Sequence, residues 1–151
     1  MPTTLNLFDN WRKIVADPAR AAAVAGTLKM AIFKAFTPNQ NLHDFYDDMV
    51  AATNEVVGTG YTAGGNACAT PTWTGPDAAG LMTFDAADPS TWLQNAAGFT
   101  LARRAILYYD TGVAGTSRLV GYSADFGADV GSIAGDVSIA FAAAGIYTAP
   151  R

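Results

Sequence analysis

The chain has 151 residues, of which 50% are apolar and only 15% are charged, and its net charge is −4. Because phosphate contacts require concentrated lysine and arginine, the absence of any basic cluster excludes a nucleic-acid-binding face. The single cysteine, Cys68, excludes an intrachain disulfide, and we expect the chain to be made and folded in a reducing cytoplasm.

The sparse charge leaves two interpretations of the surface. Globular proteins carry about 25% charged residues, so either much of this exterior packs against other subunits, or the chain is a neutral monomer. No apolar segment approaches the length of a membrane span, and the first residues lack the pattern of a secretion signal. We therefore expect no membrane association.

Residues 1–26 are predicted to form an N-terminal helical arm. Within residues 5–16, four apolar side chains share one face of a helix. They are Leu7, Trp11, Ile14 and Val15. Asp17 before Pro18 and the stop at Gly26 predict a second helix over residues 19–25. Such an arm packs on its own sheet or reaches a neighbouring molecule, and we favour the first.

From residue 27 the pattern changes to that of strands. Residues 27–33 alternate with period two, which predicts a strand with one buried face. Residues 99–110 are apolar on both faces and predict a central strand covered on both sides. Shorter strands are predicted over residues 81–85, 119–126, 137–141 and 146–148, with an edge strand or loop around Trp73. Residues 27–151 are thus predicted to form one mainly β domain, an antiparallel β-sandwich of the immunoglobulin-like or jelly-roll-like kind.

A glycine-rich segment, residues 54–65, follows an acidic helix-like segment and precedes the later short strands. Its sequence, Asn-Glu-Val-Val-Gly-Thr-Gly-Tyr-Thr-Ala-Gly-Gly, contains four glycines in its last eight residues. It lacks the lysine of a phosphate-binding loop, and no amphipathic helix follows it. We predict a tight turn that allows another backbone to approach closely, and expect Gly60 to be essential for it.

The sequence contains few groups for chemistry. His43 is the only histidine and lies at the start of a short predicted helix that either Asn41 or Asp44 caps. It could act as a base or metal ligand with Asp44, Asp47 and Asp48, but helical spacing favours a surface hydrogen bond to Asp47. No Gly-x-Ser-x-Gly motif supports a serine triad.

Three other sets of residues have an ordinary structural interpretation. Asp77, Asp85 and Asp88 match no calcium loop and are expected to be solvated loop acids. Cys68 has no neighbour that would lower its pKa and is expected to pack in the core. Four aromatic residues could form a carbohydrate platform, but we favour a place in the core or in an interface. They are Trp73, Trp92, Tyr108 and Tyr109. We therefore predict no catalytic, cofactor or metal site.

Several motifs in order resemble one family. They are Leu28-Lys29-Met30-Ala31-Ile32-Phe33, the glycine-rich segment, Ala102-Arg103-Arg104-Ala105-Ile106-Leu107-Tyr108, and Gly121 with Asp125-Phe126-Gly127. This set resembles small virion structural proteins of tailed bacteriophages, which share an opening Leu-Lys-x-Ala-Leu-Tyr strand, the Gly-Thr-Gly-Tyr-Thr-Ala-Gly-Gly turn and a late Asp-Phe-Gly. Phe33 replaces the usual tyrosine, and both the N-terminal helices and the stretch from Cys68 to Pro76 lie outside the resemblance.

The resemblance implies a non-enzymatic capsid decoration or cement protein on the outer head surface. Its partner would be the major capsid protein, and decoration proteins of this kind often act as homo-oligomers, with a trimer favoured. The alternative is a tail- or fibre-associated virion protein that contacts a host glycan through exposed aromatic residues.

Overall fold

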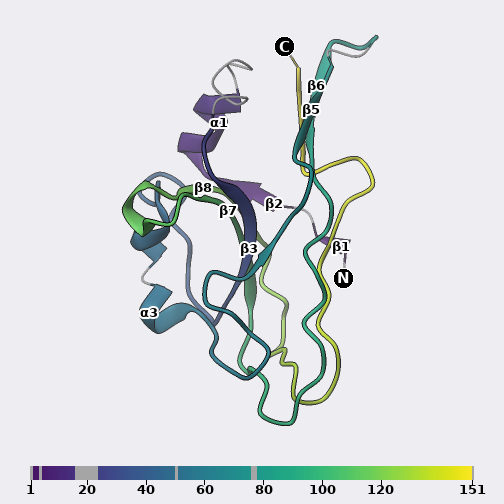
Figure 1. The fold of residues 1–151 in the computed structure, drawn as a ribbon. Helices are drawn as coiled ribbons and strands as arrows, with labels where there is room; N and C mark the ends of the chain where they lie inside the picture. Colours follow the sequence, from purple (N-terminus) through teal and green to yellow (C-terminus); the bar gives the residue numbers. More distant parts are fainter. Residues whose placement is uncertain (1, 4, 16–23, 50, 76–77, 151) are drawn as a thin grey trace.

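The chain is mainly β and forms two antiparallel sheets, one of five strands and one of three (Figure 1). The computed structural model describes residues 2–3, 5–15, 24–49, 51–75 and 78–150. The larger sheet has the order β2 (Leu5–Leu7), β8 (Arg118–Ser123), β7 (Arg104–Asp110), β3 (Thr27–Phe33) and β4 (Asn66–Ala67). The smaller has the order β10 (Tyr147–Pro150), β6 (Leu81–Asp85) and β5 (Thr72–Thr74).

The predicted central strand is confirmed. β7 lies in the middle of the larger sheet, between β3 and β8, and its five inner residues are all buried. It begins at Arg104, later than the apolar pattern predicted. Leu101 has a φ of 62°, in the left-handed region, and such a residue cannot continue a strand. Ala102, which lies before β7, pairs instead with Val130, and the Phe99 carbonyl accepts the N–H of Ser132.

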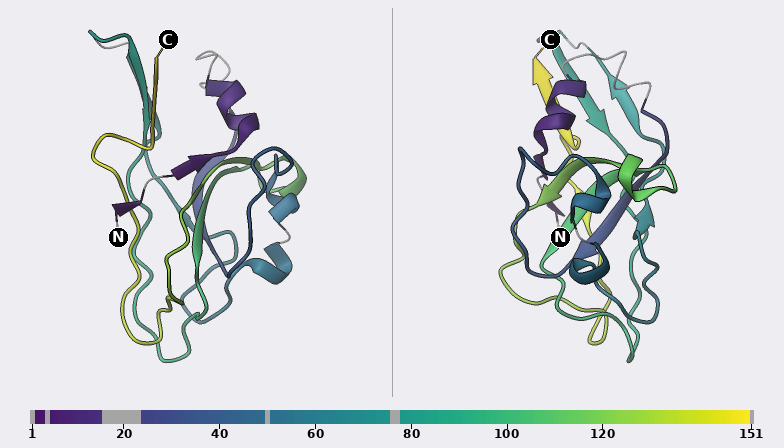
Figure 2. Two further views of the ribbon diagram at one scale, coloured as in Figure 1. Left: turned by 180° about the vertical axis from the view of Figure 1, so that it is seen from behind. Right: turned by 90° about the vertical axis from the view of Figure 1, so that its left-hand side faces the viewer.

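β3 is confirmed as a strand, but the prediction that only one of its faces is buried is wrong. Ala31 and Phe33 are as fully buried as Met30 and Ile32 on the opposite face. Tyr46 and Met49 of the short helix η1 (Tyr46–Met49), which precedes α3 (Ala51–Asn54), pack on them, with the Tyr46 ring 5.9 Å from that of Phe33. Figure 2 shows these helices and the three-stranded sheet on opposite sides of the larger sheet.

The N-terminal residues contribute a strand as well as a helix. Leu5–Leu7 pair with β8, so the prediction of one helix over residues 5–16 is wrong in its first part, and α1 spans Asp9–Val15. Trp11 is fully buried, with its ring 5.7 Å from that of Phe84. The described part of this segment therefore packs on the chain's own sheets, as favoured above.

The rest of the N-terminal prediction lies largely outside the described residues. This holds for the expected second helix, of which only residues 24 and 25 are described, and they are not helical. A boundary between an arm and a domain after residue 26 stays a prediction. None of the described helices is long and apolar enough to cross a membrane.

The smaller sheet is built as its sequence predicts. β5 lies at an edge, where its neighbouring prolines are tolerated, and β6 takes the middle position beside the C-terminal strand β10. On its inner side Phe84 joins the main hydrophobic cluster, and the Trp73 ring stacks on it at 4.7 Å. β1 (Pro2–Thr3) and β9 (Ala140–Phe141) form a separate parallel pair.

Candidate functional site

The glycine-rich segment lies against the larger sheet, and its predicted role as a closely approached turn is confirmed. A methyl group placed on Gly65 would overlap the carbonyl oxygen of Met30 in β3, and one on Gly58 would overlap the backbone of Phe99. Gly65 also has a φ of +74°. Gly60 has a φ of +79°, but no atom lies within 4 Å of its added methyl. The essential positions are therefore Gly58 and Gly65 rather than Gly60.

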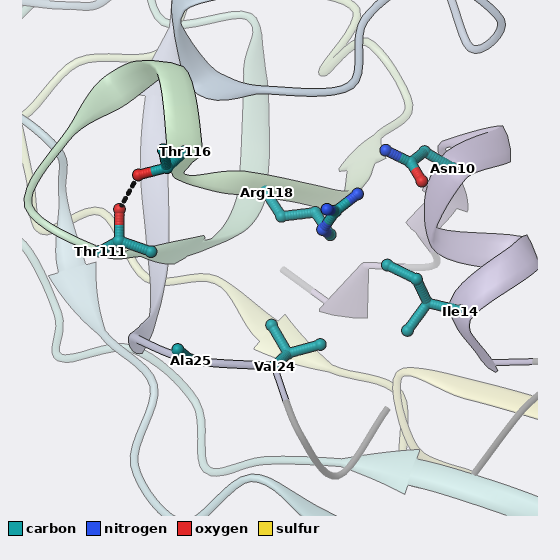
Figure 3. Close-up of a pocket in the computed structure, with 7 residues that line it drawn as sticks. All are labelled: Asn10, Ile14, Val24, Ala25, Thr111, Thr116 and Arg118. Atoms are coloured by element: carbon teal, nitrogen blue, oxygen red, sulfur yellow. Dashed lines mark hydrogen bonds between the residues drawn. The ribbon is translucent and has the colours of Figure 1, made fainter. Parts of the chain in front are cut away.

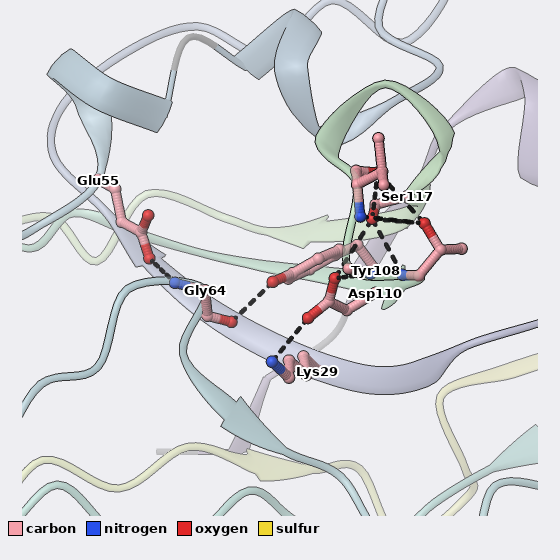
Figure 4. Close-up of polar contacts among 9 residues, drawn as sticks. Lys29, Glu55, Gly64, Tyr108, Asp110 and Ser117 are labelled. Carbon is pink, nitrogen blue, oxygen red and sulfur yellow. Dashed lines mark hydrogen bonds and ion pairs between the residues drawn. The ribbon is translucent and has the colours of Figure 1, made fainter.

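A buried carboxylate fastens this segment to the sheet. Glu55 Oε1 accepts hydrogen bonds from the Tyr61 hydroxyl and the Gly64 N–H, both at 2.6 Å. The Tyr61 oxygen in turn accepts the N–H of Ile32 at 2.9 Å. From the other side, the Tyr108 hydroxyl donates to the Gly64 carbonyl at 2.9 Å (Figure 4). We call Glu55, Tyr61, Gly64 and Tyr108 the Glu55 clasp.

The clasp is a structural network rather than a reactive centre. Burial, and then the charge of Glu55, raises the pKa of Tyr61 far above its ordinary value. Burial, and then Asp110, raises the pKa of Tyr108. Both hydroxyls consequently stay protonated and remain donors. Glu55 is only 7% exposed, so its carboxylate is engaged inside the protein and meets no substrate.

A second polar cluster fixes the loop between β7 and β8. Lys29 Nζ lies 2.6 Å from Asp110 Oδ2, and Asp110 Oδ1 accepts the N–H of Gly112 at 2.8 Å and the Ser117 hydroxyl at 3.3 Å (Figure 4). The loop contains a short helical turn, η2 (Ala114–Thr116). These bonds hold it against the end of β3.

This cluster predicts a loss of stability in acid. The hydrogen bond from Lys29, with help from Gly112 and Ser117, lowers the pKa of Asp110 in the folded state below its usual 3.8. As the pH falls, this carboxylate takes up a proton in the unfolded chain before it does so in the folded chain. The stabilisation is therefore complete above about pH 4 and is lost as the pH falls through the folded pKa. For a partly exposed pair we expect about 0.2–1 kcal/mol. Urea titrations at pH 6 and pH 2.5 should show that Asp110→Asn reduces this acid sensitivity. An unchanged acid sensitivity in the variant would contradict the assignment.

The expected hydrogen bond from His43 to Asp47 is not present. His43 Nδ1 instead accepts the N–H of Asn39 at 3.2 Å, because residues 39–43 form a turn before η1 begins at Tyr46. The carboxylate of Asp48 accepts the N–H groups of Asp44 and Phe45. Asp48 therefore organises the backbone beside His43.

The other candidate residues also have structural surroundings. Asp85 and Asp88 accept backbone N–H groups of Ala86 and Phe141, and Asp77 lies outside the described residues. Among the residues described, no group of three or more potential metal ligands comes together. Cys68 is buried, and burial together with the nearby Asp88 raises its pKa to about 12. Its thiol is therefore not an activated nucleophile.

The four candidate aromatic residues belong to the core, as favoured above. Trp92, Tyr108 and Tyr109 are at most 5% exposed, and Trp73 is half-buried, with its ring stacked on Phe84 of the neighbouring strand β6. Their faces are covered by other rings rather than by solvent. They therefore present no flat platform for a sugar ring.

The exposed apolar side chains gather instead at one end of the molecule. Four of the six large hydrophobic residues that the described surface exposes lie in three neighbouring segments, 57–61, 93–101 and 129–137. These segments are bonded together, for example from Thr59 N–H to the Ala97 carbonyl and from Asn95 N–H to the Ser132 carbonyl. We call them the loop end; in Figure 1 it is the lower end. The four residues are Val57, Leu93, Leu101 and Ile133.

Leu101 is the unusual residue of the loop end. It is 51% exposed although its backbone is left-handed, a conformation that costs a non-glycine residue about 1–2 kcal/mol. Leu101 and Ile133 line a hollow of about 260 Å³ beside Asp129. Strain of this kind persists where neighbouring bonds impose it, and it is concentrated at functional positions.

Sequence reasoning missed the two residues that define these features. Glu55 is an isolated acid directly before the glycines, which is a signal that could have pointed to a buried acceptor. Nothing in the sequence around Leu101 indicates its conformation. Comparisons with protein-family models, curated proteins and solved structures find no match to this chain.

Proposed function

We propose that this chain is a decoration or cement protein of a tailed-bacteriophage head. In this role it is a non-enzymatic virion protein that binds the major capsid protein on the outer surface and bridges coat subunits, as a homo-oligomer for which a trimer is favoured. The proposal includes its two sheets packing as an antiparallel β-sandwich. The resemblance of the glycine-rich segment and its companion motifs supports it, together with a surface on which only 15% of residues are charged.

The loop end is the observation on which the proposal rests most. Fully burying a leucine or isoleucine side chain contributes about 1.5–3 kcal/mol, so a surface that includes Leu101 and Ile133 can bind an uncharged partner without a charged patch. The bonds between its segments hold it as one rigid surface. Such a surface needs little ordering on binding, which favours affinity.

The test is binding to undecorated capsids assembled from the coat protein encoded beside this chain. The purified protein should cosediment with them and raise the temperature at which they disrupt. Leu101→Asn combined with Ile133→Asn should weaken binding by more than about tenfold, because about 1.4 kcal/mol corresponds to one factor of ten. Asparagine tolerates the left-handed backbone, so the variant keeps its fold.

Leu42→Asn is the matched control, because Leu42 is 72% exposed and lies outside the loop end. It should bind as the wild type does. Absence of capsid binding by the wild type would refute the proposed function, whereas equal binding by all variants would refute only the role of the loop end. We do not propose the glycan-binding tail protein, because Trp92 is only 2% exposed.

A further inference from the structure

A second hollow, distant in sequence from the loop-end hollow, lies between α1, the residues before β3 and the loop that contains η2. It measures about 450 Å³. Arg118 extends into it from the start of β8, toward Asn10 on α1, while Thr111 and Thr116 form the opposite wall (Figure 3). Ile14 and Val24 form its apolar side.

Arg118 has no anionic partner among the described residues. Within the described part of the chain it forms no ion pair, whereas Arg12, Lys29, Arg103 and Arg104 each lie beside a carboxylate. Of the described acids near this hollow in sequence, Asp9 lies beside Arg12 and Asp110 beside Lys29, while Asp17 lies outside the described residues. No described residue that lines the pocket therefore compensates the charge of the guanidinium.

The position of this guanidinium is fixed before any ligand arrives. Its carbon lies 5.1 Å from the centre of the Phe45 ring, a cation–π contact, and the backbones of Phe45 and Arg118 are bridged. On the opposite wall, Thr111 and Thr116 are joined through their hydroxyls at 2.6 Å. Preorganised walls reduce the ordering cost of binding.

The α1 helix supplies both a donor and an apolar surface. Asn10 and Ile14 are four residues apart and lie on one face of the helix, which lines the hollow, while Trp11 and Val15 are buried in the core. The Asn10 side chain forms no hydrogen bond to another described residue, so its amide is available beside the guanidinium. The pocket therefore combines one positive charge, a neutral donor and an aliphatic wall.

We propose that this pocket binds a carboxylate carried on a short aliphatic body. Arginine binds carboxylate in a bidentate manner through two parallel N–H···O bonds, and one guanidinium balances one negative charge. A phosphate would gain nothing from Ile14 and Val24, and a neutral ligand would leave the charge of Arg118 unmatched. The carboxylate comes either from a free organic acid or from an acidic side chain of a protein partner.

The direct test is a titration of the isotope-labelled protein with hexanoate, followed by NMR at the Arg118 Nε–H and the Asn10 side-chain amide. Both signals should shift and saturate. Hexanamide, which has the same aliphatic body without the charge, should bind at least about tenfold more weakly, and so should hexanoate to Arg118→Gln. Lys34→Gln, a change at a cation that donates to the Thr53 carbonyl, should leave hexanoate binding as in the wild type.

Three results would overturn the proposal: no saturable shift, equal binding of hexanamide, or undiminished binding to Arg118→Gln. If loss of the contact with Phe45 unfolds that variant, Asn10→Ala and Ile14→Asn replace it, and each must weaken hexanoate binding.

A competition assay separates the two sources of the carboxylate. Under the proposed head function, hexanoate that displaces the protein from capsids identifies a side chain of the coat as the ligand. Hexanoate that binds without displacing it identifies a free acid. If the protein does not bind capsids at all, the head function fails while the hexanoate titration still decides the pocket.

Discussion

Gly65→Ala is expected to prevent stable folding, with a loss of at least about 4 kcal/mol of unfolding free energy. The added methyl would overlap the carbonyl oxygen of Met30, which lies within β3 beside the central strand, and it would meet a backbone φ of +74°. Neither the strand nor the turn can move without breaking bonds of the larger sheet. Soluble yield and urea denaturation measure the effect.

Gly60→Ala is the matched control for this change. Gly60 shares the left-handed conformation of Gly65 but has open space where a methyl would lie, so its substitution should cost only about 1–2 kcal/mol. Similar losses for the two variants would show that turn conformation alone matters and that close approach to β3 does not.

Glu55→Ala is expected to cost about 3 kcal/mol, the second largest effect of a single substitution. The change removes the acceptor for the Tyr61 hydroxyl and the Gly64 N–H, and each buried donor left without a partner costs about 1–3 kcal/mol. Because Glu55 is only 7% exposed, the truncated side chain also leaves a cavity. Urea denaturation at neutral pH gives the free energy directly.

A double-mutant cycle separates the clasp from simple truncation. Tyr61→Phe removes one of the two donors without changing the ring, and the coupling between it and Glu55→Ala should reach about 1 kcal/mol. Asp129→Ala provides the control, because that carboxylate is 56% exposed and should contribute less than about 0.5 kcal/mol. The clasp has no energetic importance if Glu55→Ala costs no more than this control.

Local pattern predicted the strands that dominate the sheets. The apolar run in β7 and the period of two in β3 and β8 are properties of neighbouring residues, so they can be recognised without the fold. The second buried face of β3 could not, because Tyr46 and Met49 that cover it come from a separate segment. β2 was mistaken for helix because the spacing of Leu7, Trp11 and Ile14 fits one helical face even though the first of them lies in a strand.

The residues of the candidate site also divide into those that local sequence indicates and those that depend on the three-dimensional fold. The presence of several glycines was enough to predict that another backbone approaches this segment closely. Which glycine is approached depends on where Met30 and Phe99 lie in three dimensions. Both donors to Glu55 belong to its own segment, whereas the lack of a described ion-pair partner at Arg118 depends on ion pairs formed elsewhere. Whether a charge has a partner depends on where the acids lie in three dimensions, which local sequence does not specify.

The pairing of β3 with β7 also sets the order in which the chain can fold. β7 and β8 are joined by one short loop, and hairpins of this kind form in about 1–10 μs. Pairing of β3 with β7 instead requires the long loop between Phe33 and Arg104 to close before the first bond forms. The conformational entropy of that loop is lost before the contacts between the strands compensate for it. We therefore infer that the β7–β8 hairpin forms first and that docking of β3 is the slow step. Variants that weaken the contacts of β3 with β7 should then slow folding, because those contacts form in the slow step.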